Sequence, residues 1–382
     1  MQKKIIIGIL IIWIFGMSLI GLLMPKRTFS EMENRYLAEL PAISFSSIAD
    51  GSFEEKFEVW LNDHFAMRDY FVRLSKIKTY ALGVREFGDV YYAEDDTLLR
   101  KLSVNRERLD KNNAALIQYA DAAEVPVDFA LIPGAVDIWS AKLPSAAPHV
   151  DQKAMIQDVY QTVRQGTEAL QKQQEECYVN CIDLYDTLAA HDEEYIFYHT
   201  DHHWTSLGAY YAYSAYAEAI GCPASAVTEY PDRLLSGNFK GTLYSDVPLP
   251  WIRPDEIHAY VPEGNIGVTV FDGSKYKEGR LYAEEHLQEK NQYTVFLGGN
   301  QPIVVIQNPE AGQEKLLIVR DSYMDSMAPF LTADFSELHL IDPRYYKQSL
   351  NQYIKEHDID RVLICMSLSS YMESTGLPAV LR

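Results

Sequence analysis

One uninterrupted apolar run stands near the N-terminus, at residues 5–24. It contains no charged residue, follows two lysines and ends before a Pro-Lys-Arg sequence. At roughly 1.5 Å per residue, a helix of this length matches the ~30 Å hydrocarbon core of a bilayer. A cleaved signal peptide has a shorter apolar centre and an A-x-A-like cleavage site, which this run lacks. Residues 1–27 are therefore predicted to form a short cytoplasmic stub and an uncleaved anchor, giving a single-pass cell-membrane protein whose remaining residues lie outside the cytoplasm.

The next segment, residues 28–84, reads as a linker followed by an amphipathic helix. Pro41 interrupts its first half. From Ser52 to Leu82, aromatic residues recur at three- and four-residue spacing, beginning with Phe53, Phe57 and Trp60. This spacing places the rings on one face of a helix, and we expect that face to dock on the main domain.

Residues 85–382 alternate between apolar strand-like runs and amphipathic helix-like segments. Predicted strands lie at 125–132, 178–184, 315–319, 338–341 and 361–366, and predicted helices at 106–123, 151–174, 207–220, 322–331 and 348–357. Continuous apolar strands alternating with helices are typical of a mostly parallel sheet covered on both faces, so an α/β fold is expected. Residues 223–301 are richer in Gly, Pro and short strand-like runs, and are predicted to be an insertion in this domain.

Composition narrows the classes of function. The chain has 382 residues, of which 47% are apolar and 23% charged, and its formal net charge is −20. These values fit a large folded domain, and the negative charge argues against nucleic-acid binding. The four cysteines include no C-x-x-C pair, so no structural zinc site is predicted. The sequence leaves open the disulfide state of Cys177, Cys181 and Cys222.

The densest group of ionisable residues is the segment His199-Thr200-Asp201-His202-His203-Trp204, directly before the predicted helix 207–220. An adjacent Asp and His can serve acyl transfer, because the imidazole takes a proton from a hydroxyl nucleophile while the carboxylate orients it. A hydrogen-bonded structural loop is the alternative. Four titratable groups within five residues favour a functional site. Metal binding through His199, Asp201 and His203 is a further alternative, although no H-E-x-x-H pattern is present.

A candidate nucleophile follows the apolar strand 315–319. Ser322 stands just beyond this strand, at the sheet edge where open α/β folds place their sites. The chain lacks G-x-S-x-G, so the α/β-hydrolase nucleophile turn is not predicted. Serine is also a common helix cap, so its position alone is weak evidence for a nucleophile. Ser322 is a candidate because the histidine segment could supply its base.

These residues together resemble a known family. The segment 200–205, with Gly208-Ala209-Tyr210 behind it, is similar to the signature of the DHHW protein family, which resembles SGNH-like O-acetyltransferases that modify alginate and other exopolysaccharides. Further similar motifs follow in family order, at 29–35, 239–245, 296–300, 321–323 and 342–346. The resemblance covers nearly the whole chain beyond the anchor.

The resemblance implies an SGNH-hydrolase-like three-layer α/β/α fold in which Asp and His precede Ser. It assigns Ser322 as nucleophile, His203 as general base and Asp201 as its orienter, with His202 as an alternative base. Arg320 occupies the place of the glycine in the common G-D-S block. Further candidates for oxyanion or substrate contacts are Gly298, Asn300, Arg344, Trp204 and Tyr323. No cofactor and no metal are implied.

The implied activity is acetyl transfer through an acyl-serine onto an extracellular or cell-wall polysaccharide. Acetyl-CoA is cytosolic, so the implied donor partner is a membrane-bound O-acyltransferase. Two alternatives remain open, namely a carbohydrate acetyl-esterase with the same triad and a non-catalytic carbohydrate-binding scaffold.

Overall fold

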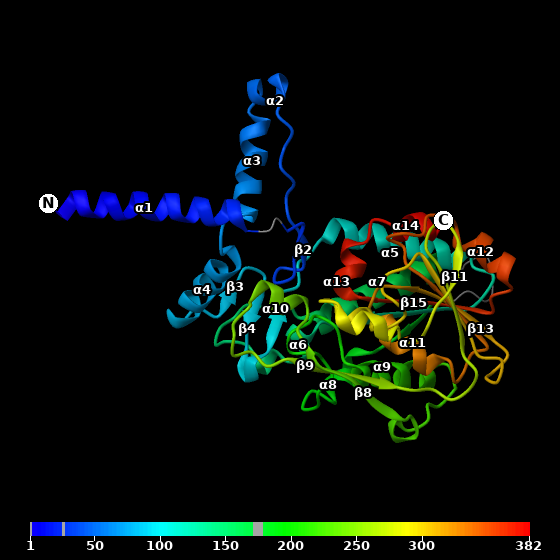
Figure 1. Ribbon diagram of the computed structural model, residues 1–382. Helices are drawn as coiled ribbons and strands as arrows, with labels where there is room; N and C mark the ends of the chain where they lie inside the picture. The colour runs from blue at the N-terminus through cyan, green and yellow to red at the C-terminus, as the bar shows by residue number, and fades with distance from the viewer. Residues whose placement is uncertain (1, 25–26, 171–178) are drawn as a thin grey trace. The chain divides into compact units, whose positions relative to one another are not determined.

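The computed structural model describes residues 2–24, 27–170 and 179–382 (Figure 1). The chain divides into two compact units. The first comprises residues 1–87 and 244–252, and the second comprises residues 88–243 and 253–382. Cys177 lies outside the described residues, as does the end of the predicted helix 151–174.

The first unit begins with the apolar helix α1 (Gln2–Leu23). Among the described residues, α1 alone is long and apolar enough to cross a membrane, and a signal sequence has the same properties. Its other elements are β1 (Phe29–Ser30), β2 (Arg35–Tyr36), α2 (Phe45–Ala49), α3 (Ser52–Asp63), α4 (Arg68–Ala81) and β3 (Glu86–Phe87).

The single helix expected over 52–82 is broken into α3 and α4. The break coincides with Met67, which has the left-handed φ of 57°. At the end of α3, the carboxylate of Asp63 accepts hydrogen bonds from the guanidinium of Arg35 and from the Ala38 amide at 2.8 Å. The Arg35 hydrogen bond is the main cause that lowers the pKa of Asp63 to about 2. A long-range ion pair of this kind cannot be read from helical periodicity.

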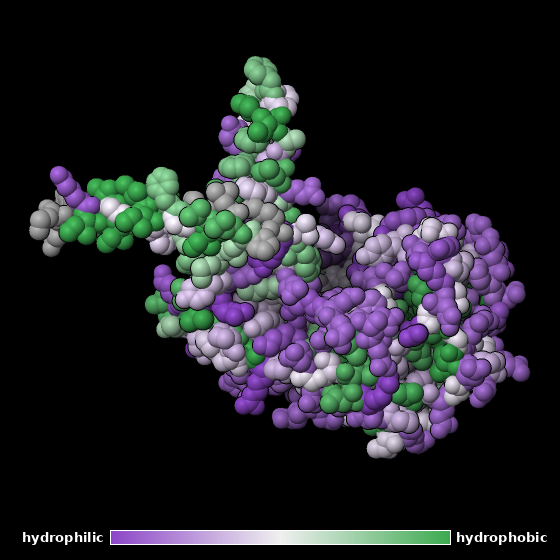
Figure 2. All heavy atoms as spheres, viewed as in Figure 1, coloured by the Kyte–Doolittle hydropathy of each residue, from purple (hydrophilic) through white to green (hydrophobic). Residues whose placement is uncertain are grey.

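Hydrophobic side chains gather over α1 and over α2 and α3 (Figure 2). On α3 the rings of Phe53, Phe57 and Trp60 stack in series, with centroids 5.6 and 5.5 Å apart. Phe45 on α2 is 90% exposed. The expected docking of this aromatic face on the main domain stays a prediction.

The second unit is built on an eight-stranded mixed sheet with the order β11-β10-β12-β14-β13-β15-β6-β7. Five neighbouring strands run parallel, in the order β14-β13-β15-β6-β7. The other three, β12, β10 and β11, each pair antiparallel with their neighbours. The strands are β6 (Val127–Ile132), β7 (Val179–Ile182), β10 (Gly267–Phe271), β11 (Tyr276–Glu278), β12 (Ile303–Gln307), β13 (Lys315–Arg320), β14 (Glu337–Ile341) and β15 (Arg361–Ser367). The expectation of an α/β fold with a mostly parallel sheet is confirmed.

Helices cover both faces of this sheet (Figure 1). One layer contains α5 (Arg106–Ala122), α7 (Gln152–Leu170), α12 (Leu350–His357), α13 (Leu368–Glu373) and α14 (Leu377–Val380). The other contains α6 (Ala135–Ile138), α8 (Tyr185–Ala189), α9 (Ser206–Ala219) and α11 (Met324–Leu331). Strand β13 is continuously apolar because both of its faces are buried. Leu316 and Ile318 pack on the α9 side of the sheet, and Leu317 and Val319 pack on the α5 side.

The range 223–301, expected to be an insertion, contributes to two sheets. Strands β8 (Asp232–Phe239) and β9 (Asp255–Tyr260) form a separate antiparallel pair. Strands β10 and β11 instead extend the central sheet at one edge. The remaining elements of the second unit are the hairpin β4 (Val90–Tyr92) and β5 (Leu98–Arg100), with the 3₁₀ helices η1 (Glu94–Asp96), η2 (Ser140–Lys142), η4 (Val227–Glu229), η5 (Glu284–Gln288) and η6 (Gln292–Val295). Helix α10 (Thr242–Asp246) follows β8.

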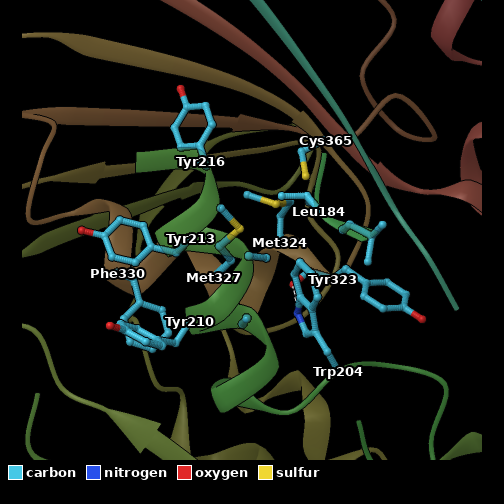
Figure 3. Close-up of a cluster of buried hydrophobic side chains, with 14 of the residues drawn as sticks. Leu184, Trp204, Tyr210, Tyr213, Tyr216, Tyr323, Met324, Met327, Phe330 and Cys365 are labelled. Atoms are coloured by element: carbon cyan, nitrogen blue, oxygen red, sulfur yellow. Dashed lines mark hydrogen bonds between the residues drawn. The ribbon is translucent and has the colours of Figure 1, made fainter. Parts of the chain in front are cut away.

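An aromatic cluster joins α9 to α11 beneath the sheet (Figure 3). Tyr213 of α9 stacks on Phe330 of α11, with ring centroids 5.7 Å apart. Met324, Met327 and the buried Cys365 complete the contact. These helices follow the histidine segment and Ser322 respectively, so their packing fixes the two segments relative to each other.

Candidate active site

Ser322 lies at the carboxyl end of β13, between that strand and α11. The preceding residue fixes the turn: the Asp321 carboxylate accepts hydrogen bonds from Ser367 N at 3.0 Å, Ser367 Oγ at 2.7 Å and Tyr323 N at 3.1 Å. Ser367 ends the neighbouring strand β15. The turn that carries Ser322 is therefore tied to the adjacent parallel strand rather than held by local glycines.

His203 reaches Ser322 from a segment 119 residues earlier in the chain. Its Nε2 lies 2.8 Å from Ser322 Oγ, and its Nδ1 lies 2.6 Å from Asp201 Oδ1. The segment leads into α9, whose N-cap Thr205 accepts a hydrogen bond from Gly208 N. The structure thus brings together Asp201, His203 and Ser322 in the order required for acyl transfer.

Asp201 is fully buried, and both of its carboxylate oxygens accept hydrogen bonds. His203 N donates to Oδ1 at 3.1 Å, while Thr242 donates to Oδ2 through N at 2.7 Å and through Oγ1 at 3.0 Å. Burial opposes the charge, but the neighbouring imidazoles of His202 and His203 and these hydrogen bonds together lower the pKa of Asp201. Gly241 approaches so closely that a Cβ there would collide with the Asp201 side chain. The carboxylate is therefore a fixed anion beside His203.

His202 takes a different position. Its Nδ1 lies 2.9 Å from Thr242 Oγ1 and 3.4 Å from Asp201 Oδ1. Burial, and then the charge of His203, lower the pKa of His202 to about 4. The geometry therefore offers Ser322 one base, His203, and leaves His202 as a neutral neighbour.

Aromatic side chains connect the histidine segment, residues 199–204, with the turn that carries Ser322. Trp204 is fully buried, and its Nε1 donates to Tyr323 O and Ser326 Oγ, both at 2.9 Å (Figure 3). Tyr323 in return donates from its hydroxyl to the carbonyl oxygen of His202. Trp204, a candidate substrate contact from the sequence, is placed as a brace with no exposed surface, whereas Tyr323 also lines the cavity at Ser322.

The structure adds Tyr293, which sequence reasoning did not single out. Its ring stacks on the His203 imidazole, with centroids 3.8 Å apart and an interplanar angle of 7°. Its hydroxyl donates to Ser322 O at 3.1 Å. Tyr293 comes from η6, inside the predicted insertion, and no spacing in the sequence connects it with the histidines.

Asp255 is a second residue that the sequence did not reveal. From the start of β9, its carboxylate accepts hydrogen bonds from Tyr195 Oη at 2.5 Å, His199 N at 2.9 Å, Thr200 N at 2.8 Å and Thr200 Oγ1 at 2.5 Å. These hydrogen bonds hold the backbone directly before Asp201. Asp255 therefore clamps the segment that carries Asp201 and His203.

A cavity of about 320 Å³ opens at Ser322. Its walls include Asp201, His202, Tyr323 and Arg344. Gly298 and Asn300, the predicted oxyanion donors, are not among the residues that line it. Gly298 and Gly299 have left-handed φ values of 74° and 86°, and Asn300 Oδ1 accepts a hydrogen bond from Arg344 at 3.0 Å.

Arg320 points away from this cavity, into the protein. It is fully buried, and its Nη1 lies 2.9 Å from Asp325 Oδ1 and 3.8 Å from Asp342 Oδ2. Burial raises the pKa of Asp325 to about 7, although Arg320 opposes the shift. The arginine at the usual glycine position thus forms a buried ion pair behind the turn of Ser322.

Asp201, His202 and His203 are also the group of described residues whose ligand atoms lie close enough to hold a metal ion, within 4.8 Å of one another. Both nitrogens of His203 and Nδ1 of His202 already contact Asp201, Ser322 or Thr242. His199 is outside this group, and its ring packs edge-on against Trp139 and Tyr195. The contacts fit a hydrogen-bonded triad better than a coordination sphere.

The chain matches one family model and several solved structures. A family model described as DHHW protein matches residues 111–341, a range that contains both the histidine segment and Ser322. A DHHW family protein from Eubacterium siraeum is 24% identical, with a TM-score of 0.63 over 78% of this chain and 96% of the other. Bacillus cereus PatB1, solved with a sulfonyl adduct, is 22% identical, with a TM-score of 0.59 over 76% and 98%. The O-acetyltransferase domain of Pseudomonas putida AlgJ is 16% identical, with a TM-score of 0.46 over 75% and 92%. No curated protein matches the sequence.

Proposed function

Because the chain belongs to the DHHW protein family, we propose that it is a serine-dependent O-acetyltransferase of the SGNH type. Its substrate would be an extracellular or cell-wall polysaccharide. One observation carries the proposal: an unbroken series of contacts runs from Asp201 through His203 to Ser322. The acetyl group is inferred from the resemblance of the motifs to polysaccharide O-acetyltransferases.

The proposed reaction has two halves. Ser322 Oγ loses its proton to His203 Nε2 and attacks the carbonyl carbon of an acetyl ester. The tetrahedral intermediate collapses, and the departing alcohol takes the proton from His203, which leaves an acetyl-serine. A sugar hydroxyl then gives its proton to His203 and attacks this ester. Collapse returns the proton to Ser322 Oγ and releases the acetylated sugar.

Each contact has a role in this scheme. The fixed negative charge of Asp201 stabilises the imidazolium that forms on His203 in both halves. The Ser322 amide, at the turn before α11, is the proposed donor to the developing oxyanion. Water in place of the sugar would make the same site an esterase.

We further propose that α1 holds the chain in the cell membrane with the second unit outside the cytoplasm. The acetyl donor must then be supplied across the membrane, and a membrane-bound O-acyltransferase is the proposed partner. The apolar character of α1 supports this part of the proposal.

The test uses the full chain in detergent with 4-nitrophenyl acetate as donor. We expect a burst of nitrophenol, and a loss of about 10³-fold or more in Ser322→Ala and in His203→Ala. Ser274→Ala, which removes a serine from the exposed β10–β11 turn, is the matched control. A sulfonyl fluoride should modify Ser322, and mass spectrometry of the peptide would locate the adduct.

Three results would redirect the proposal. Full turnover in both variants would overturn the triad and favour a non-catalytic scaffold. Loss of activity to a chelator, restored by zinc, would favour the metal alternative. Unchanged products after addition of an oligosaccharide acceptor would identify an esterase.

A further inference from the structure

The wall of the cavity at Ser322 carries charge opposite to that of the whole chain. The chain has a formal net charge of −20, yet three basic residues line this cavity: Arg100, Lys101 and Arg344. They come from distant parts of the sequence, at the end of β5 and in the segment after β14. Such an accumulation is unexpected for a surface whose charges serve only solubility.

The two carboxylates in the same wall do not offset this positive charge toward a ligand. Asp201 and Asp321 are 1% and 2% exposed. Asp201 is surrounded by His203 and Thr242, and Asp321 by Ser367 and Tyr323. Both are committed to the triad and to the nucleophile turn. The charges that a bound molecule meets are those of the basic side chains.

Arg344 is held in place but remains accessible. Its Nε and Nη2 donate to the fully buried Asp342, and Nη2 also donates to Asn300 Oδ1 at 3.0 Å. Its side chain is nevertheless 44% exposed. A guanidinium oriented by a buried carboxylate loses little conformational freedom when it binds a further anion.

Arg100 supplies positive charge from another segment. Its side chain is 41% exposed, and Nη1 lies 3.4 Å from the exposed Asp89. Its charge is close enough to His202 and Tyr323 to influence both groups electrostatically. Arg100 and Arg344 therefore act on the space in which an acceptor must approach Ser322.

We propose that this cavity recognises acceptor glycans that carry an anionic group, a carboxylate or a phosphate, through Arg100, Lys101 and Arg344. The inference rests on the proposed acyl transfer and names the chemistry of its acceptor. Hydrogen-bonding groups in the same wall, on Ser369, Ser370 and Gln152, would contact the neutral part of the sugar. Long-range attraction to the basic wall would also favour encounter with acidic polymers over neutral ones.

The experiment measures binding to full-length Ser322→Ala protein, in which acyl transfer is blocked. Three probes are compared: an oligogalacturonate, the same oligosaccharide after reduction of its carboxyl groups, and a glycerol-phosphate oligomer. We expect at least one anionic probe to bind about ten-fold more tightly than the reduced one at low salt, with the difference shrinking as salt rises. The better anionic probe identifies carboxylate or phosphate as the recognised group.

Charge variants locate the binding. Arg100→Gln and Arg344→Gln should each weaken the anionic probe by about three-fold or more and leave the reduced probe nearly unchanged. Arg106→Gln is the matched control, because Arg106 is an exposed arginine of α5 outside the cavity. Melting curves of every variant would show whether it is folded, and Arg100→Gln serves as the test if Arg344→Gln is not.

Two failures are distinguishable. If anionic probes bind no better than the reduced one, or if Arg106→Gln has the same effect as Arg100→Gln, the charge inference is overturned. Absence of an acetyl-enzyme burst in the wild-type chain overturns the proposed function instead, whatever the binding results.

Discussion

Two flat side chains lie against the imidazole of His203. Tyr293 is parallel to it at 3.8 Å, and the ring of His202 is 3.9 Å away at an angle of 38°. A phenol face attracts a cation, so Tyr293 favours the imidazolium that acyl transfer requires, whereas a protonated His202 would oppose it. Burial keeps His202 neutral above about pH 4.

Two variants of Tyr293 separate the contribution of its ring to kcat from that of its hydroxyl. Tyr293→Phe keeps the stack and should lower kcat for 4-nitrophenyl acetate by a few-fold, to about one third. Tyr293→Leu removes the stack and should lower kcat by about ten-fold or more and shift the acidic limb of the pH–rate profile to lower pH.

Tyr198→Leu is the matched control for those variants. It deletes a buried ring that packs on Tyr293 and has no described contact with the His203 imidazole, and it keeps the backbone hydrogen bond from Tyr198 N to His203 O. An identical pH profile in wild type and Tyr293→Leu would show that the tyrosine only fills space.

His202 also links stability to pH. Its pKa of about 4 in the folded protein lies below the ~6.5 of an unfolded chain, so the unfolded state binds more protons between these values. The free energy of unfolding should therefore fall as pH drops from about 6.5 to 4, and His202→Gln should remove about 1 kcal/mol of that fall, since the side chain is partly exposed. Guanidinium titrations at both pH values measure the difference. Equal pH slopes in the two proteins would contradict the assignment.

Among the site residues, those that the sequence could predict are close together or follow a strand end. Asp201 and His203 are neighbours, and Ser322 follows an apolar strand at the edge where α/β sites occur. Tyr293 and Asp255 reach the site across long separations from the range expected to be an insertion. Their contacts depend on the tertiary fold. No periodicity or spacing in the sequence connects these two residues with Asp201, His203 or Ser322.

At the scale of elements, β9 supports the histidine segment. Its first residue, Asp255, binds the backbone of residues 199 and 200 directly before Asp201. Burial raises the pKa of Asp255, and its four described hydrogen bonds offset the cost of burying a carboxylate there.

Asp255→Ala should therefore loosen the segment that carries Asp201 and His203. We expect kcat to fall by about 10- to 100-fold, because small displacements of a base are costly, with a loss of about 2 kcal/mol or more in stability. Assays well below the melting temperature separate the two effects. Asp232→Ala, at the far end of the same strand pair, removes an exposed carboxylate and should change kcat little. Comparable losses in both variants would argue against the clamp.

Elements of the parallel core were predictable because their apolar runs are long and flanked by helices. The antiparallel strands β10 and β12 were not recognised as sheet strands. Strand β10 lies in a Gly- and Pro-rich range with little periodicity. The places of β10 and β12 in the sheet depend on antiparallel pairing, of β10 with β12 and of β12 with β14. The break between α3 and α4 was missed for a similar reason, since it coincides with the contacts of Asp63.

At the scale of the molecule, the family resemblance inferred from the motifs is confirmed by the match over residues 111–341. The described triad lies wholly within the second unit, whereas α1 belongs to the first. The sequence distinguishes the apolar segment of residues 5–24 from the remainder by hydropathy, whereas the division of the structure falls later, between residues 87 and 88. It could not place the 244–252 segment, which belongs to the first unit although it lies within the range of the second.

A chain lacking residues 1–27 tests the separation of anchor and site. We expect it to move from the membrane fraction to the soluble fraction and to hydrolyse 4-nitrophenyl acetate within about two-fold of the full chain in detergent, because a compact unit with its own core can act alone. Fractionation and specific activity measure the two results. Retention in the membrane would contradict the anchor, and loss of activity in a folded truncated chain would show that the first unit supports the site.

The hydrogen bonds of Asp321 to Ser367 would have a consequence for the proposed export of the second unit. Ser367 ends the last strand of the sheet, and His203 was synthesised 119 residues before Ser322. If the second unit is exported as proposed, the histidine segment would emerge first, the serine later, and strand β15, which holds the serine turn, last of the three. With the proposed function, a partly translocated chain would lack the contact that holds the turn of Ser322 and would not consume acyl esters. The onset of turnover would then mark the joining of strand β15 to the sheet.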